Sequence, residues 1–215
     1  MLDPDVVVVA SGSGPGLTLP FEGTVVAADG GLDRALELGL AVDVVVGDLD
    51  SVTPETLAAA EAAGATVVRH PRAKDETDLE LALEEAAARG AHRVLVVASA
   101  QGRLDHLLGS LLLLTAERFR GFELDALVGD ALVHVIRGER TLHGAPGELV
   151  SLLAMGGPAR GVVTDGLEYP LRAETLEPGS TRGISNVFTG DTATVAVADG
   201  TLLAVLVGRP EGAAA

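Results

Sequence analysis

The chain has 215 residues, of which 47% are apolar and 2% aromatic, so it is long enough for one or two domains built around an aliphatic core. Its 31 acidic residues outnumber its 15 basic residues, and the net charge of −16 argues against binding to a nucleic-acid backbone. The chain contains no cysteine, which excludes disulfides, thiolate metal sites and a cysteine nucleophile.

The first half of the chain alternates β-branched apolar runs with helical segments. Thr53 and Pro54 are typical of the cap and first residue of a helix, and Thr77 with Glu80 forms a capping-box pattern. Strands and helices that alternate with short connections predict a parallel sheet with helices on both faces. The predicted strands are 6–10, 24–28, 42–46, 66–69 and 93–98, and the predicted helices are 32–38, 54–64, 78–89 and 104–118.

The second half of the chain shows no convincing helix. Short apolar runs are separated there by glycine, proline and aspartate, which predicts a small β-sandwich or barrel-like domain. We therefore predict an α/β domain at 1–132 and a β-rich domain at 133–215. The predicted strands of the second domain are 132–136, 149–154, 161–164, 192–198 and 202–207.

No segment predicts export or membrane insertion. Residues 1–9 carry acids where a signal peptide carries bases, and the apolar run 107–116 is shorter than the ~20 residues that span a bilayer. Together with the absence of cysteine, this leads us to expect a cytoplasmic protein that binds neither membranes nor nucleic acids.

Ligands of an open parallel sheet bind outside the carboxyl ends of its strands, so the residues that follow each strand are the candidate site. Polar, acidic and glycine residues collect after the predicted strands. The glycine-rich segment 11–16 lacks the spacing and the following helix of a dinucleotide-binding loop and lacks a Walker lysine, so we interpret it as a flexible turn. This spacing also argues against an NAD-dependent oxidoreductase.

Two pairs of acids at strand and helix ends are candidate metal ligands. If the chain stays extended after residue 46, Asp48 and Asp50 point to the same side, an arrangement that suits Mg²⁺. Asp75 and Asp78 lie three residues apart at a helix start and share a face. Solvated turn residues and simple capping charges are the alternatives for these pairs.

Basic residues near these acids could contact phosphate. Lys74 is the only lysine, and it either contacts phosphate as a point charge or merely neutralises the acids beside it. Arg103 offers a fork of donors at the start of a long helix, where free backbone N–H groups also favour anions. Asp105 follows it as a candidate metal ligand or base, whereas His106 is more typical of a packing residue.

Seven motifs, in order and spacing, resemble the thiamine pyrophosphokinase family. Four lie in the first half and three in the second, where they resemble the family's thiamine-binding β-domain. They are ADGG (28–31), GDLDS (47–51), KDETD (74–78), GRLDH (102–106), LLAMGGP (152–158), GLEYPL (166–171) and ISN (184–186).

The resemblance implies transfer of the terminal diphosphate of ATP to the hydroxyl of thiamine, which gives thiamine diphosphate and AMP. It implies that Mg²⁺ is required and that thiamine and ATP are the ligands. It also implies a homodimer whose active sites lie at the subunit interface. An acidic cleft would attract the thiazolium cation, and Mg²⁺ would reconcile the same acids with the phosphates of ATP.

The resemblance also assigns roles to individual residues. In the catalytic half, Asp48, Asp50 and Asp78 match magnesium-binding positions, with Asp50 and Asp78 also counted as catalytic. Asp105, near the thiamine end, and its neighbour Arg103 complete the catalytic set. The substrate-binding set is Asp29, Lys74, Asp75 and Thr77 in the first domain and Tyr169, Ser185 and Asn186 in the second.

The sequence departs from the family pattern at two positions. Gln101 stands where the family usually has glycine, and Tyr169 stands where it often has tryptophan stacking on the pyrimidine ring. Because Tyr169 is the only tyrosine, a core position is its alternative role. Two alternative functions are a diphosphokinase for another alcohol, such as a hydroxymethyl pterin, and a non-catalytic binding protein.

Overall fold

The computed structural model describes residues 2–12 and 21–208, which divide into two compact units. The N-terminal unit comprises the described residues up to 110 together with 121–130. The β-rich unit comprises residues 111–120 and 131–208. Of the glycine-rich segment 11–16, residues 13–16 lie outside the described part of the chain.

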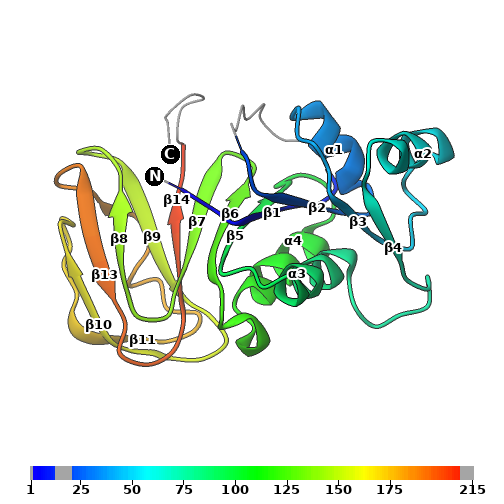
Figure 1. Ribbon diagram of the computed structural model, residues 1–215. Coiled ribbons are helices and arrows are strands. Elements are labelled where there is room, and N and C mark those ends of the chain that lie inside the picture. The colour runs from blue at the N-terminus through cyan, green and yellow to red at the C-terminus, as the bar shows by residue number, and fades with distance from the viewer. Residues whose placement is uncertain (1, 13–20, 209–215) are drawn as a thin grey trace. The chain divides into compact units, whose positions relative to one another are not determined.

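A parallel sheet in the order β6-β5-β1-β2-β3-β4 runs through the N-terminal unit. Strand β1 is a run of four buried valines, as expected for a strand covered on both faces. Figure 1 shows α1 and α2 on one face of the sheet and α3 on the other. The strands are β1 (Val6–Val9), β2 (Thr24–Ala28), β3 (Val44–Gly47), β4 (Thr66–Arg69), β5 (Arg93–Ala98) and β6 (Glu123–Val128).

The helices of this half begin where their capping residues predict. The hydroxyl of Thr53 accepts a hydrogen bond from the backbone N–H of Thr56 at 3.1 Å, and that of Thr77 accepts one from Glu80 at 3.2 Å. Among the described residues, no helix combines the length and apolar character needed to cross a membrane. The helices are α1 (Gly31–Glu37), α2 (Pro54–Ala62), α3 (Asp78–Ala88) and α4 (Leu104–Leu114).

Helix α4 ends four residues before its predicted end at residue 118, and the short 3₁₀ helix η1 (Glu117–Phe119) follows it. The guanidinium of Arg137 donates hydrogen bonds to the carbonyl oxygens of Leu114 and Ala116, both at 3.3 Å. These bonds satisfy carbonyl groups that a helix end leaves without partners. Burial lowers the pKa of Arg137.

The β-rich unit contains two antiparallel sheets, in the orders β12-β9-β14-β7 and β11-β10-β13-β8. Its regular elements across residues 131–208 are all strands, which confirms the predicted α/β plus β-sandwich fold class. The strands are β7 (Ala131–Ile136), β8 (Glu139–His143), β9 (Leu149–Ala154), β10 (Ala159–Asp165), β11 (Arg172–Leu176), β12 (Asn186–Val187), β13 (Thr192–Ala196) and β14 (Leu202–Leu206).

Candidate active site

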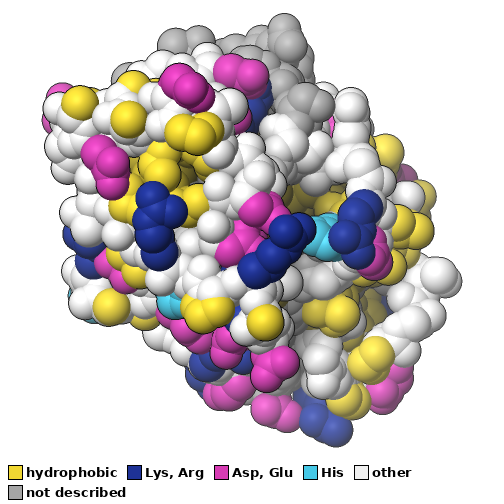
Figure 2. All heavy atoms as spheres, turned by 90° about the vertical axis from the view of Figure 1, so that its right-hand side faces the viewer, with side chains coloured by type: hydrophobic (Ala, Val, Ile, Leu, Met, Phe, Trp, Pro, Cys, Tyr) yellow, Lys and Arg dark blue, Asp and Glu magenta, His cyan; other side chains and the backbone are white. Residues whose placement is uncertain are grey.

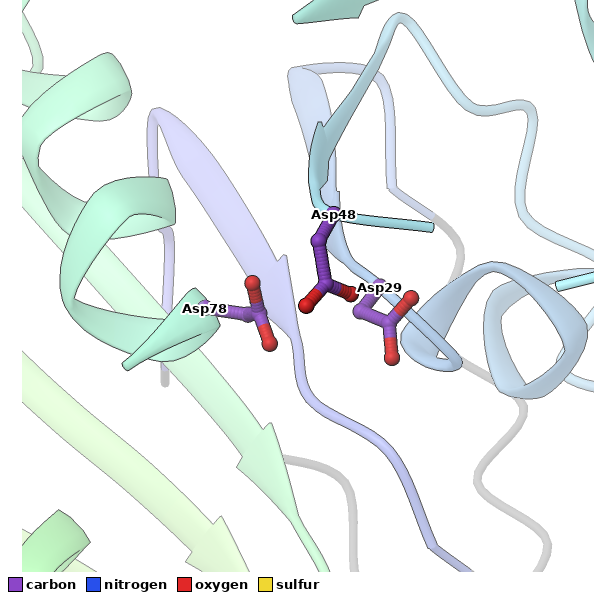
Figure 3. Close-up of side chains that lie close together, drawn as sticks. All are labelled: Asp29, Asp48 and Asp78. Carbon is purple, nitrogen blue, oxygen red and sulfur yellow. The ribbon is translucent and has the colours of Figure 1, made fainter. Parts of the chain in front are cut away.

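Three aspartates from three separate segments meet at the carboxyl edge of the parallel sheet. Asp29 follows β2, Asp48 follows β3, and Asp78 is the first residue of α3. One carboxylate oxygen from each lies within 4.8 Å of the others. Figure 3 shows the Asp78 side chain extending from its helix toward Asp48, with Asp29 beside them. We call these three residues the acidic cluster.

Gly47 makes room for the acidic cluster. It ends β3 with a φ of +146°, and a Cβ at this position would lie 2.9 Å from Asp78 Oδ1 and 3.1 Å from the Cβ of Asp29. A methyl group would therefore occupy space that the two acids now fill. Only glycine combines this backbone conformation with so close an approach.

The backbone fixes the buried Asp29 in place. Its φ of +46° lies in the left-handed region, which aspartate tolerates better than most residues. Its N–H donates to the carbonyl of Val46 at 2.8 Å, and its Oδ1 accepts the N–H of Ser51 at 3.4 Å. Strand β3, which ends just before Asp48, therefore also helps to position Asp29.

Lys74 lies against the acidic cluster. Its Nζ is 2.9 Å from Asp78 Oδ1 and 3.7 Å from Asp48 Oδ2, and only 10% of its side chain is exposed. Burial lowers the pKa of Lys74, but the hydrogen bond to Asp78 and the charges of Asp78 and Asp48 outweigh burial, so the pKa is raised overall. In the structure Lys74 neutralises charge on Asp78 and Asp48, and its contact with phosphate stays a prediction.

The acidic cluster has the chemistry of a site for a hard divalent cation. Its donors are carboxylate oxygens, the ligands that Mg²⁺ prefers. Asp78 Oδ1 is buried, and apart from the ion pair with Lys74 it has no hydrogen-bond partner among the described residues. The set of donors, the buried oxygen and the space left by Gly47 together fit a metal ion.

Asp50 lies outside the acidic cluster. The chain does not remain extended after β3, because Leu49 has a φ of +61° and the N–H of Asp50 turns back to Asp48 Oδ1 at 3.2 Å. The condition for Asp48 and Asp50 to point the same way is therefore not met. Asp50 instead pairs with Arg72, 2.9 Å away, and Figure 2 shows acidic and basic side chains side by side on the face beyond β4.

Two other predicted site residues lie beside Asp78. Thr77 caps α3 through its hydroxyl, so its oxygen already accepts the N–H of Glu80. Asp75 is exposed in the segment between β4 and α3.

Arg103 and Asp105 pair with each other at the start of α4. Two hydrogen bonds, of 3.1 and 2.6 Å, join the guanidinium to the carboxylate, and both side chains are largely exposed. The hydrogen bond from Arg103, opposed by some desolvation and assisted by the His106 N–H, lowers the pKa of Asp105 to about 2. Asp105 therefore stays ionised at neutral pH.

The predicted thiamine residues lie together in the β-rich unit. Tyr169 is 53% exposed, which excludes the core position considered for it. The amide of the buried Asn186 holds the backbone of Tyr169, since its Nδ2 donates to the Tyr169 carbonyl at 2.8 Å and its Oδ1 accepts the Tyr169 N–H at 3.0 Å. Ser185 is exposed at a φ of +56°, and its N–H donates to Ser151 Oγ at 3.1 Å.

Sequence reasoning missed three residues that shape the site. Gly47 belongs to a quoted motif, but its contribution is a missing side chain, which no chemical pattern reveals. Arg72, the partner of Asp50, and Ser151, the partner of Ser185, come from segments without a motif of their own, so only their distances identify them.

Both units match models of known domains. Residues 20–125 match the model described as the thiamin pyrophosphokinase catalytic domain. Residues 133–202 match the model described as the thiamin pyrophosphokinase vitamin B1 binding domain. The two matches follow the division between an α/β part and a β-rich part.

Two curated thiamine pyrophosphokinases are similar in sequence to this chain. The chain is 26% identical over 186 residues to the thiamine pyrophosphokinase of Bacillus subtilis. The aligned region covers 84% of this chain and 85% of that relative. The chain is 27% identical over 164 residues to thiamine pyrophosphokinase 1 of Oryza sativa subsp. japonica, covering 70% of this chain and 60% of that longer protein.

Two crystal structures share the fold over nearly the whole chain. The thiamine pyrophosphokinase of Bacillus subtilis superposes with a TM-score of 0.82 at 24% identity and covers 95% of this chain and 99% of its own. That of Geobacillus thermodenitrificans has a TM-score of 0.79 at 25% identity and covers 95% and 97%.

Proposed function

Because the chain belongs to the thiamine pyrophosphokinase family, we propose that it transfers the terminal diphosphate of ATP to the hydroxyl of thiamine. The acidic cluster at the carboxyl edge of the sheet carries this proposal, since it fits a cation that would bridge the acids to phosphates. A cytoplasmic location belongs to the same proposal, because ATP is supplied there.

The proposed metal is Mg²⁺, with Asp29, Asp48 and Asp78 as its candidate ligands. When bound, Mg²⁺ would neutralise charge that develops on the phosphates during transfer. Asp50 enters the proposal through the family resemblance alone, since its carboxylate pairs with Arg72 in the structure.

The reaction needs positioning and electrostatics rather than a protein nucleophile. We propose that the thiamine hydroxyl attacks the β-phosphorus in line. The bond from this phosphorus to the oxygen that links it to the α-phosphorus breaks, and AMP leaves with that oxygen. The hydroxyl proton passes to an aspartate. The acceptor is Asp105 or an acid of the cluster, and the negative charge of Asp105 also attracts the thiazolium cation.

The remaining side chains of the proposed site bind the two substrates. The guanidinium of Arg103 is exposed and offers a fork of donors to phosphate. The Tyr169 ring is exposed for stacking on thiamine, and Asn186 fixes the backbone from which it projects. Ser185 beside them supplies an exposed hydroxyl, while Asp75 and Thr77 border the acidic cluster.

Product analysis tests the proposed reaction. Purified protein is incubated with ATP, Mg²⁺ and thiamine, and the nucleotides and thiamine esters are separated by chromatography. We expect AMP and thiamine diphosphate in equal amounts. ADP with thiamine monophosphate would show a different phosphoryl transfer, and product only with another alcohol, such as a hydroxymethyl pterin, would overturn the assignment of thiamine.

Replacing Tyr169 by alanine tests the thiamine subsite. Loss of stacking on an aromatic ring costs about 1–3 kcal/mol, so we expect the KM for thiamine to rise by about 5-fold to 150-fold. The KM for ATP should stay unchanged, because Tyr169 belongs to the β-rich unit. Tyr169→Phe is the matched control and should keep a low KM, whereas an unchanged KM in Tyr169→Ala would remove this residue from the subsite.

A homodimer is part of the proposal, and α4 offers a surface for it. Leu104, Leu108 and Leu112 are exposed at a spacing of four residues, which places them along one face of the helix. Exposed apolar stripes of this kind mark interaction sites, and two copies of one helix can form a symmetric contact.

Replacing Leu108 by glutamate tests this dimer contact. A charge in the middle of the stripe should shift the protein from dimer to monomer, as measured by light scattering during size-exclusion chromatography. Leu36→Glu, at an exposed leucine on α1, is the matched control and should remain dimeric. A dimeric Leu108→Glu variant would place the contact elsewhere, and turnover of the monomer shows whether the active site needs the second subunit.

A further inference from the structure

The ammonium of Lys74 lies against two of the three acids of the acidic cluster. Its Nζ lies within 4 Å of both Asp48 and Asp78, and its side chain is nine-tenths buried. It is the only lysine in a chain that otherwise uses arginine for its basic residues. Lysine suits this place because its ammonium is a compact point charge on a flexible stem, whereas the guanidinium of arginine is a rigid plane.

The ammonium and a free divalent cation compete for the same carboxylates. If Lys74 stays, its positive charge repels a metal ion only a few ångströms away. If Lys74 leaves, its ion pair with Asp78 and Asp48 must first be broken. Either way, the cluster binds a bare metal ion less tightly than three unpaired carboxylates would.

A phosphate ligand changes this balance. A triphosphate brings anionic oxygens that form charge-assisted hydrogen bonds with an ammonium. Lys74 can then exchange Asp78 for phosphate without losing a partner, and the cluster becomes available to the metal. Its four-carbon stem allows this movement without any change in the backbone.

From this arrangement we propose that Lys74 is an internal counter-ion that keeps the acidic cluster from binding free metal and releases it when a metal–nucleotide complex arrives. This inference rests on the proposed function, because it takes ATP and Mg²⁺ as the ligands. It makes Lys74 a positioning residue that couples metal binding to nucleotide binding. The ammonium remains protonated throughout, so no proton transfer is involved.

The test is the affinity for Mn²⁺ alone, used as a spectroscopic substitute for Mg²⁺ and measured by the electron paramagnetic resonance signal of the free ion. Lys74→Met removes the charge and keeps an unbranched apolar stem. We expect it to bind Mn²⁺ about tenfold more tightly than the unmodified protein, as expected when one nearby positive charge is removed. Lys74→Arg keeps the charge and should retain the weak binding.

A second measurement is the thermal midpoint with and without metal. In EDTA, Lys74→Met should melt below the unmodified protein, because its clustered carboxylates are no longer neutralised. Mn²⁺ should raise its midpoint more than that of the unmodified protein, since binding to the folded state stabilises it. Arg160→Met, which removes an exposed charge paired with Asp199 in the β-rich unit, is the matched control and should change neither quantity.

The outcomes separate this inference from the proposed reaction. Equal or weaker Mn²⁺ binding by Lys74→Met would overturn the counter-ion role, even if the protein makes thiamine diphosphate. Tighter binding that is lost again on adding Asp78→Asn would support the role at this site, even if the reaction proves to be a different one. Lys74→Gln provides a second neutral variant if Lys74→Met fails to fold.

Discussion

Asp78→Asn is expected to reduce turnover at least about 100-fold, the scale on which metal sites respond to lost support. The substitution removes one charge from the acidic cluster, and it is the charge nearest to Lys74, at 2.9 Å. Steady-state kinetics at saturating ATP, Mg²⁺ and thiamine measure the effect. The KM for thiamine should change much less, because Asp78 is assigned to the metal and not to thiamine.

The matched control is Asp33→Asn, which makes the same change at an exposed position on α1 and should leave turnover unaltered. Asp50→Asn belongs in the same series. A loss of turnover as large as that of Asp78→Asn would show that Asp50 joins the cluster when substrates bind. Near-normal turnover of Asp78→Asn at saturating Mg²⁺ would refute the proposed metal site.

Gly47→Ala is the second substitution with a large expected effect. The added methyl group would lie 2.9 Å from Asp78 Oδ1 and 3.1 Å from the Cβ of Asp29, so the Asp78 carboxylate must shift and Asp29 must adjust slightly. A displacement of about 1 Å in a site of this kind costs about 100-fold in rate. We expect a loss of turnover on that scale, together with weaker binding of Mn²⁺ when nucleotide is present.

The control for Gly47→Ala separates backbone strain from steric contact. Gly64 also has a positive φ, +106°, but a Cβ there would meet nothing within 4 Å. Gly64→Ala should therefore lose about 1–3 kcal/mol of stability and keep its turnover. If both variants lose stability but keep their turnover, Gly47 is needed for folding and not for the geometry of the acidic cluster.

The first half of the fold is predictable, except for strand β6, because its signals are local and agree with one another. Buried parallel strands appear as solid valine runs, and the caps at Thr53 and Thr77 define helix starts within a residue. The early end of α4 was not predictable, because its apolar run continues while Arg137, from a distant segment, binds the last carbonyls.

The strands missed in the β-rich unit have a common cause. Strand β8 buries only Leu142, and β11 buries only Leu176, so neither forms an apolar run. Strand β12 has two residues and is defined by pairing with β9. Such strands exist because neighbouring strands offer hydrogen-bonding partners, a condition that a local window of sequence does not contain.

The sequence predicted which residues belong to the site better than it predicted how they are arranged. Asp29, Asp48 and Asp78 follow predicted strands, which placed them at one sheet edge, and their carboxylates lie together in the structure. Grouping Asp50 with Asp48 rested on an extended chain, which the left-handed conformation of Leu49 breaks. Nothing in the residue types revealed that Asn186 would use both polar atoms of its amide on the backbone of Tyr169.

The exposed position of Tyr169 gives the protein a built-in optical reporter. The chain has one tyrosine and no tryptophan, so excitation at wavelengths that phenylalanine does not absorb gives emission from this single ring. The ring is about half exposed and lies on a backbone held by Asn186. Quenching of that emission during a titration with thiamine therefore reports binding at Tyr169, and no fluorescent label is needed.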